Sequence, residues 1–183
     1  MEKRIVLKRK DGKEISAKFV LLKSTDIDAI INLQEEIYNG LDDKQLYSPS
    51  TKEEFLEFTE EKGRIVGCVT EDNQLIAMGV YCNLKYHKDN YAYDIDLQGD
   101  EVLTVGQIES TLVREEYRGN RLQKQICELL EEIGLENNTP IMCATASPYN
   151  KYSVNTFLNL GYKIAKDKIK YAGLRRYVFV KEL

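Results

Sequence analysis

The sequence predicts an α/β fold of the α+β type, with a mixed, mostly antiparallel central sheet of about seven strands and helices on both faces. Strand-like alternation of apolar and polar residues occurs at both ends of the chain and in its middle. Two amphipathic stretches follow the first strands, and two more separate the later ones. No repeat, low-complexity tract or Pro/Gly linker interrupts the chain, so residues 1–183 are expected to form a single domain.

Residues 4–62 predict a hairpin followed by two helices. Residues 4–23 alternate around a polar turn at 10–13, which is typical of two antiparallel strands. The residues at 24–26, Ser-Thr-Asp, are all favourable helix N-caps. The isoleucines that follow share one side of a helix: Ile27, Ile30, Ile31 and Ile37. Thr51 and Glu54 have the spacing of a capping box, so a second helix is expected to begin there.

The remaining elements alternate between strands and helices. The stretches 64–70 and 75–85 flank a polar turn and indicate a second hairpin. An acidic, tyrosine-rich connection leads to a strand over 102–113, and a helical stripe begins at Leu122. A short buried strand, a short helix ended by Gly161 and two final strands complete the chain. The unit from 102 to 146 is expected to be a right-handed parallel crossover.

Composition argues against several classes of protein. Apolar residues make up 43% and charged residues 31% of the 183 positions, as in a globular domain with a real core. No apolar run approaches the roughly 20 residues of a membrane span, and the N-terminus lacks the apolar stretch of a signal peptide. The basic residues of the first 23 positions alternate with apolar ones, as on a solvated strand. We therefore expect a cytoplasmic protein with neither a membrane nor a nucleic-acid partner.

The cysteines and the single histidine predict no metal site. The four cysteines form no CxxC pair and lie in apolar stretches, so we expect reduced thiols in the core: Cys68, Cys82, Cys127 and Cys143. A histidine-based zinc site or a Ser-His-Asp triad would have to use His87, and no partner motif accompanies it.

The start of the helix near 122 has features of an anion site. The first amides of a helix have no partner within it, and the macrodipole places partial positive charge there. Gly119 permits close approach, and Arg118 and Arg121 add planar cationic donors. Asn120 is a favourable N-cap, with Gln123 three positions later as in a capping box. Because such helix starts are also common without a ligand, a phosphate site and an ordinary helix start both stay open here.

Two segments resemble those of a known family. Residues 112–132, LVREEYRGNRLQKQICELLEE, resemble the acetyl-CoA-binding segment of GNAT N-acetyltransferases, where a strand leads into an Arg/Gln-x-x-Gly-x-Gly/Ala loop and a helix. Residues 144–163, ATASPYNKYSVNTFLNLGYK, are similar to the second cofactor segment of that family. The order of elements matches over nearly the whole chain. The resemblance implies a GNAT-like fold that uses acetyl-CoA as co-substrate and needs no metal.

By this resemblance, the cofactor contacts fall on both segments. The residues expected to contact acetyl-CoA are Leu112, Val113, Arg118, Gly119, Asn120, Arg121, Leu122, Gln123, Asn150 and Ser153. The chain departs from the family pattern at Arg121 and Gln123, where small residues are usual. Main-chain amides could still bind the diphosphate if these side chains point away, or Arg121 could itself reach a phosphate. Asn150 is at the same time a plain N-cap for the helix that follows.

The chemistry of acetyl transfer needs a base, and Glu109 is the candidate. Alkyl ammonium groups have pKa values near ~10, so an amine must lose a proton before it attacks. Alternation along the strand places Gln107, Glu109, Thr111 and Val113 on one face. A carboxylate within a central strand is unfavourable unless it is solvated or partnered, which a substrate cleft would allow. The alternative is an exposed or ion-paired glutamate at a strand edge.

A proton donor for the departing thiolate is harder to identify. The family often has a tyrosine four residues before the glycine that ends the helix, and here that position is Phe157. Tyr149 is the candidate substitute, and Tyr152 lies nearby in sequence. Both positions are also consistent with packing or surface tyrosines. Because the thiol of coenzyme A is acidic enough to leave as a thiolate, the reaction could also proceed without an acid.

The function expected from this resemblance is direct transfer of an acetyl group to a primary amine. Small-molecule and peptide acceptors both stay open, including peptide N-termini, lysine side chains, polyamines and aminoglycoside-like amines. Acceptor specificity is assigned to the loops 39–50 and 86–101, and the acidic side chains of the second would suit a cationic amine. The alternatives are an inactive acyl-CoA-binding or regulatory module and a nucleotide-binding protein of another kind. A homodimer is one candidate for the oligomeric state.

Overall fold

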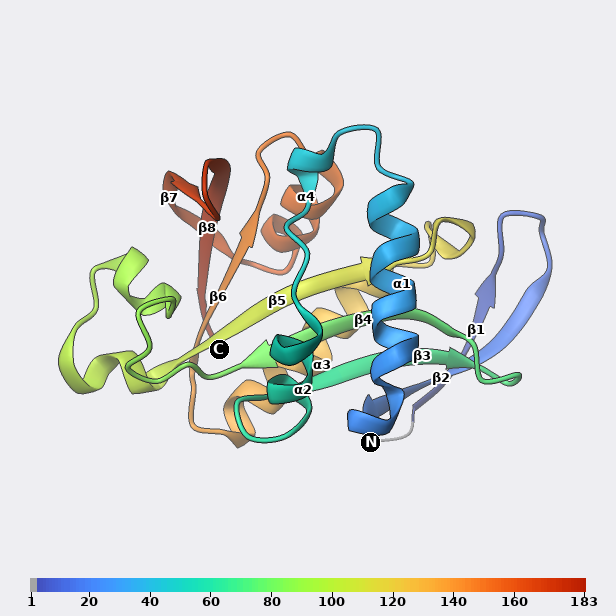
Figure 1. The fold of residues 1–183 in the computed structure, drawn as a ribbon, viewed down its shortest axis with the longest axis horizontal. Coiled ribbons are helices and arrows are strands. Elements are labelled where there is room, and N and C mark those ends of the chain that lie inside the picture. The colour runs from blue at the N-terminus through green and yellow to red at the C-terminus, as the bar shows by residue number, and fades with distance from the viewer. Residues whose placement is uncertain (1–2) are drawn as a thin grey trace.

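The sheet has eight strands, one more than expected, in the order β1-β2-β3-β4-β5-β6-β8-β7 (Figure 1). This arrangement comes from a computed structural model, which describes residues 3–183. All neighbouring strands are antiparallel except β5 and β6, which pair in parallel as the predicted crossover requires. The expectation of a mixed, mostly antiparallel sheet is therefore confirmed.

The N-terminal half contains two hairpins and two helices where the sequence places them. Strands β1 (Lys3–Lys8) and β2 (Glu14–Leu22) form the first hairpin, and β3 (Gly63–Thr70) and β4 (Leu75–Cys82) form the second. Helices α1 (Ile27–Asn39) and α2 (Lys52–Thr59) lie between them. The capping box of α2 is present as predicted, with Thr51 and Glu54 bonding each other's main-chain amides.

The C-terminal half carries the parallel crossover and a final antiparallel hairpin. Its elements are β5 (Val105–Val113), α3 (Leu122–Glu136), β6 (Ile141–Ala146), α4 (Lys151–Asn159), β7 (Lys163–Lys170) and β8 (Leu174–Glu182). Two short 3-10 helices, Tyr91–Ile95 and Gly99–Thr104, shape the connection between β4 and β5. This connection packs its own small core against β5 and β6.

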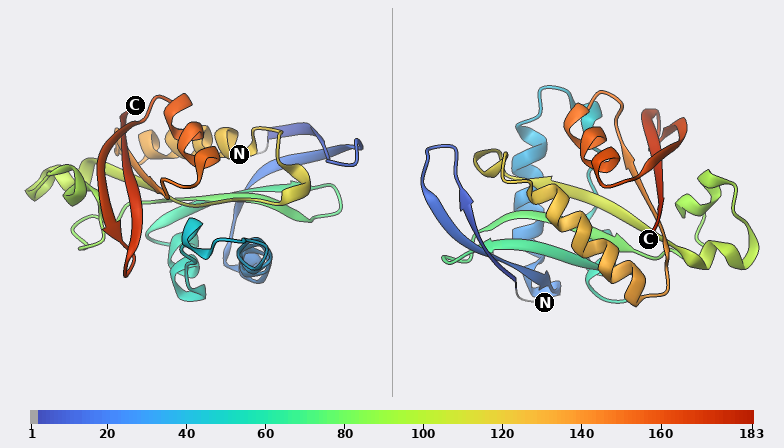
Figure 2. Two further views of the ribbon diagram at one scale, coloured as in Figure 1. Left: turned by 90° about the horizontal axis from the view of Figure 1, so that it is seen from above. Right: turned by 180° about the vertical axis from the view of Figure 1, so that it is seen from behind.

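Helices cover both faces of the sheet, as predicted. Helices α1 and α2 lie on one face and α3 and α4 on the other, which Figure 2 shows in the view from above. Each face has its own apolar cluster. The cluster under α3 includes Ile108 and Ile126, whereas the cluster under α1 and α2 includes Val80 and Leu112.

Strand β5 contains a register shift that reverses which face its side chains occupy. Met78 pairs with Leu112 and Val80 with Glu109, so Gly79 alone faces both Ser110 and Thr111. Ser110 has a φ of 30°, as one extra residue in a strand requires a local kink. The prediction that all of residues 107, 109, 111 and 113 share a face is therefore wrong. Glu109 lies on the α1–α2 face, and Thr111 and Val113 lie on the α3 face.

Strands β5 and β6 separate halfway along β5. Their pairing ends at Ile108 and Ala144, although β5 continues to Val113. The peptide groups beyond this point on the β6 side of β5 are therefore turned into an opening within the sheet. Arg114 donates its amide to Ile76, and amides in an antiparallel ladder alternate in direction. The amide of Val113 therefore points into the opening, whereas that of Leu112 points toward β4.

We predict that Gly106→Ala destabilises this part of the sheet. A Cβ atom at Gly106 would lie 2.6 Å from Tyr81 Cε2 and 2.7 Å from Met142 Sδ, which is too close for unstrained packing. The expected loss is about 1–3 kcal/mol in the free energy of unfolding, measured by urea denaturation. Gly40→Ala is the control, because its nearest neighbour is a carbonyl oxygen at 3.4 Å. Equal losses in the two variants would contradict this account.

Candidate active site

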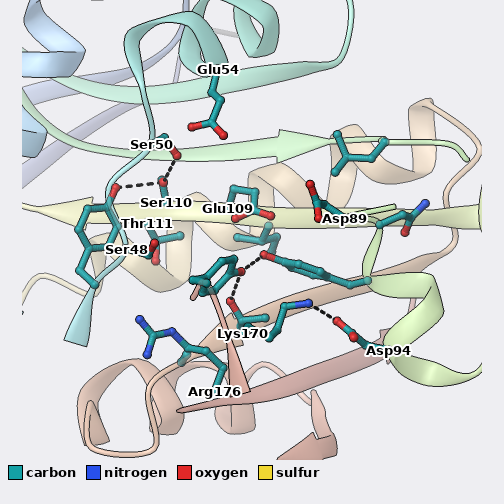
Figure 3. Close-up of a pocket in the computed structure, with 18 of the residues that line it drawn as sticks. Ser48, Ser50, Glu54, Asp89, Asp94, Glu109, Ser110, Thr111, Lys170 and Arg176 are labelled. Carbon is teal, nitrogen blue, oxygen red and sulfur yellow. Dashed lines mark hydrogen bonds and ion pairs between the residues drawn. The ribbon is translucent and has the colours of Figure 1, made fainter. Parts of the chain in front are cut away.

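A cavity of about 1060 Å³ lies where β5 and β6 separate (Figure 3). One wall comes from the loop 46–50 and from α2, and a second comes from the connection 83–94. The floor is formed by β5 and by the start of α4, and the turn between β7 and β8 forms the remaining wall. Segments from five regions of the chain therefore meet at one opening in the sheet.

Glu109 lies at the centre of this cavity. Its side chain is half-buried, and its Oε1 accepts a hydrogen bond of 3.0 Å from Gln107 Nε2. No ion pair involves Glu109 among residues 3–183, so the alternative of an ion-paired glutamate does not hold. Burial raises the pKa of Glu109, while hydrogen bonds from Tyr91 and Gln107 and the charge of Lys170 oppose this rise. A carboxylate held in this way binds a proton more readily than an ordinary glutamate.

Ser110 connects the register shift to the loop above it. The Tyr47 hydroxyl donates to Gln34 Oε1 at 2.7 Å and lies 3.0 Å from Ser110 Oγ. Gln34 is buried in α1 and also bonds both main-chain groups of Ser50. This network fixes the loop 46–50 over the cavity. Nothing in the sequence predicts this network except a glutamine on the apolar side of α1.

Two tyrosines next to Glu109 also escaped the sequence analysis. The hydroxyls of Tyr91 and Tyr171 are hydrogen-bonded to each other, and that of Tyr171 lies 3.0 Å from Thr145 Oγ1. Tyr171 belongs to the β7–β8 turn and has a φ of 48°, an unfavourable conformation for an aromatic residue. Burial and the nearby carboxylate of Glu109 raise the pKa of Tyr91. The result is a chain of hydroxyl groups from Glu109 to β6.

The structure does not bring Tyr149 to Glu109. Its side chain is 58% exposed, does not line the cavity and contacts Arg175 on the β7–β8 hairpin. Tyr152 is also exposed. Phe157 does line the cavity, but it packs against Tyr162 and Phe179 and has no proton to donate. The proton donor expected at Tyr149 is therefore not placed for that role in this structure.

The loop before α3 differs from the predicted helix cap. The N-cap of α3 is Arg121, with a φ of 56°, and its side chain makes no cap hydrogen bond. Asn120 instead bonds both main-chain groups of Lys8 and the carbonyl of Tyr117. The predicted Asn120–Gln123 capping box is therefore wrong. Gly119 has a φ of 94° and open space beside it, which leaves the main chain accessible there.

Gln123 spans the α3 side of the opening. Its Nε2 donates to Thr111 Oγ1 at 3.0 Å and to Ser153 Oγ at 3.1 Å, and so connects β5, α3 and α4. Asn150 caps α4 as predicted, by accepting from the amide of Ser153. Asn150 and Ser153 both line the cavity. Leu112 and Leu122 are buried in the core, so only their main-chain atoms could contact a ligand.

The remaining polar candidates do not indicate a metal or a reactive thiol. All four cysteines are free and buried, and burial raises the pKa of each thiol. His87 is exposed at the cavity rim beside Asp89. No cluster of three metal-binding side chains occurs in the part of the chain that the structure describes. Among the same residues, no helix is both long and apolar enough to cross a membrane.

We predict that Glu109→Gln stabilises the folded protein at neutral pH but not at acidic pH. Below the ordinary glutamate pKa of about 4.3, Glu109 is protonated in both the folded and the unfolded chain. As the pH rises, the unfolded chain ionises first, because burial raises the pKa in the folded protein. The wild type should therefore lose stability relative to the variant as the pH rises from about 4 toward neutrality. Thermal unfolding across this range tests this, with exposed Glu132 changed to Gln as control; a constant difference would contradict it.

Comparisons with solved structures agree with this fold at low sequence identity. The acetyltransferase of GNAT family from Streptococcus pneumoniae matches with a TM-score of 0.69 at 12% identity, over 91% of this chain and 99% of that one. The ribosomal-protein-S18-alanine N-acetyltransferase from Escherichia coli matches at 0.65 and 12%, over 91% and 93%. The Salmonella typhimurium protein yncA, solved with its cofactor acetyl-CoA, matches at 0.68 and 11%, over 91% and 93%.

Sequence comparison defines the family. No curated protein matches the chain. The model of the Acetyltransferase (GNAT) family matches residues 27–162, from the start of α1 to the end of the second segment singled out in the sequence. This match covers most of the chain, and it includes β5, α4 and the loop that precedes α3. The protein therefore belongs to the GNAT acetyltransferase family.

Proposed function

We propose that this protein transfers the acetyl group of acetyl-CoA directly to a primary amine. The observation that carries the proposal is the opening between β5 and β6. It has Glu109 on the α1–α2 side and the exposed start of α3 on the other side. A donor and an acceptor that enter from opposite faces would meet there, and holding two reactants in line is itself a large contribution to catalysis.

The chain offers a consistent set of groups for acetyl-CoA. The amides around Gly119 at the start of α3 suit a diphosphate, with Arg118 and Arg121 as nearby cations. The amide of Val113 suits the arm of the cofactor or the thioester oxygen, where developing negative charge needs a donor. Asn150 and Ser153 line the far side. The cofactor seen in yncA supports this choice of ligand for a related fold.

Two residues in this site, Arg121 and Gln123, stand where the family pattern has small residues. Arg121 occupies a left-handed conformation in which glycine is usual, at the residue directly before the first turn of α3. Gln123 occupies the second small position and bridges Thr111 and Ser153. For the cofactor arm to lie along β5, this bridge has to open. These hydroxyl groups are then free to bond the arm instead.

Glu109 is the proposed base. Its raised pKa suits it to accept the proton that an ammonium group must lose before attack. Glu109 then holds that proton beside the Tyr91 hydroxyl. The Tyr91–Tyr171 pair is the proposed donor to the departing thiolate, in place of Tyr149 and Phe157. In this scheme Tyr171 gives its proton to the thiolate, Tyr91 replaces it, and Glu109 returns to Tyr91 the proton that it took from the ammonium group. The nitrogen releases its second proton to solvent as the amide forms, so one proton ends on the thiol and one in solvent.

An inactive acyl-CoA-binding module is the second candidate function. Phe157 in place of the family tyrosine and the Gln123 bridge across the opening both favour it. The half-buried Glu109 beside a chain of hydroxyl groups favours catalysis, because carboxyl groups with a raised pKa in a cavity cluster at catalytic sites.

The first test combines binding with turnover. We expect acetyl-CoA to bind in calorimetry and thiol release to follow with members of a panel of primary amines. Glu109→Gln should lower kcat/KM by about 10² to 10⁴-fold at neutral pH and remove the acidic limb of the pH–rate profile. That limb should lie above the ordinary pKa of glutamate, because burial raises the pKa of Glu109. Binding without turnover would favour the inactive module, and an unchanged profile would exclude Glu109 as the base.

The proton donor has a separate test. Tyr171→Phe should lower kcat by about 10²-fold and leave the KM for acetyl-CoA unchanged, because only the hydroxyl is removed. Tyr149→Phe should have little effect, since its side chain lies outside the cavity. Tyr93→Phe, in the connection between β4 and β5, is the control for loss of a tyrosine hydroxyl away from the Tyr91–Tyr171 pair. A loss confined to Tyr149→Phe would return that residue to the role predicted from the sequence.

A further inference from the structure

Arg176 is a buried cation without a counter-charge in the wall of the cavity. It lies on β8, and its side chain is only 3% exposed. Its Nη1 donates to the carbonyl of Arg175, whereas Nη2 finds no hydrogen-bond partner among residues 3–183. No carboxylate in that range forms an ion pair with it. Figure 3 shows its guanidinium in the same cavity as Glu109.

This arrangement is unfavourable for folding alone. A buried charge without a partner is costly, and burial accordingly lowers the pKa of Arg176. The centroid of the Tyr171 ring lies 5.7 Å from the guanidinium carbon. Such a cation–π contact stabilises a buried charge only modestly. A neutral side chain would fill the same place at less cost. The charge therefore points to an anion that is absent from the free protein.

The two sides of the cavity carry opposite charge. On the β7–β8 side, Lys168 and Lys170 share the single carboxylate of Asp94, and Arg176 adds a third cation. On the opposite side, Glu54 points toward Glu109, as Figure 3 shows, and no described cation pairs with either. A molecule with positive charge at both ends would meet a repulsive wall here. A molecule with one amine and one anionic group matches both sides.

We infer that the acceptor is an amine that also carries a carboxylate, and that Arg176 binds this carboxylate while the amine faces Glu109. The inference rests on the proposed function and names its substrate class. A guanidinium offers two parallel donors to a carboxylate, and Nη2 is one of them. Because Nη2 is covered in the free protein, a neighbouring side chain has to move aside before the carboxylate of the acceptor can reach it.

Matched acceptors test the inference. Each pair differs only by the carboxylate: phenylalanine with phenethylamine, lysine with cadaverine, and β-alanine with ethylamine. We expect the wild type to favour the carboxylate member of at least one pair by roughly 10- to 100-fold in kcat/KM, the range for a hydrogen bond between charged groups. Arg176→Met should reduce this ratio to about one and leave the KM for acetyl-CoA unchanged. Arg176→Lys should keep part of the preference, since lysine keeps the positive charge but lacks the two parallel donors of the guanidinium.

The neighbouring residue supplies the control. Arg175→Met makes the same change at the next position, where the side chain is exposed and paired with Asp167, and should keep the preference. Three results would each overturn the inference. The wild type could turn over both members of every pair with equal kcat/KM, or it could prefer the members without a carboxylate. Arg176→Met could also lower kcat/KM equally for both members of a pair.

A second measurement separates this inference from the proposed function. With acetyl-CoA analogues that cannot react, the carboxylate members should raise the Tm of the wild type but not that of Arg176→Met. If no amine is acetylated yet this difference persists, the proposed transfer fails and carboxylate binding at Arg176 stands. If amines are acetylated and no such difference appears, the transfer stands and the role of Arg176 is overturned.

Discussion

The site depends on a mismatch within β5. Up to Ile108 this strand is paired on both sides, and beyond it the pairing with β6 ends and one extra residue enters the ladder with β4. Between two continuously paired strands a ligand cannot bind, because the main-chain amides are hydrogen-bonded to the neighbouring strand. The extra residue leaves Glu109 on one face and moves Thr111 to the other. Main-chain amides and a carboxylate thus become available at the same place.

The elements of the fold could be predicted because their signals are local. Alternation, helical stripes and the Thr51–Glu54 cap each act within a few residues. The structure has these elements close to where they were expected, although β5 begins at Val105 rather than at residue 102. The face of Thr111 could not be predicted, because alternation assumes an unbroken ladder. Nothing in the sequence of β5 shows where its partner β4 is one residue short.

Within the site, only the residues that belong to a recognisable sequence motif or strand pattern were predicted. Glu109, Asn150 and Ser153 line the cavity, and Gly119 leaves the main chain of its loop open. The polar groups that complete the cavity or hold its walls come from distant segments: Gln34, Tyr47, Tyr91, Tyr171 and Arg176. Their roles depend on which strands become neighbours, so a single sequence gives no local signal for them. Asn120 shows the same limit, because its amide serves Lys8 rather than its own helix.

That bond from Asn120 connects the site to the part of the chain that precedes the family match. The first hairpin lies before residue 27, where the family match begins, yet Lys8 holds Asn120 and the amide of Lys10 donates to Glu116. The N-terminal strands therefore brace the loop that precedes α3 from outside. A chain shortened to the family segment would keep strands β3 to β6, lose the other four strands of the sheet, and lose this brace with them. In this protein, the shape of the loop before α3 is maintained by strands that lie outside the matched segment.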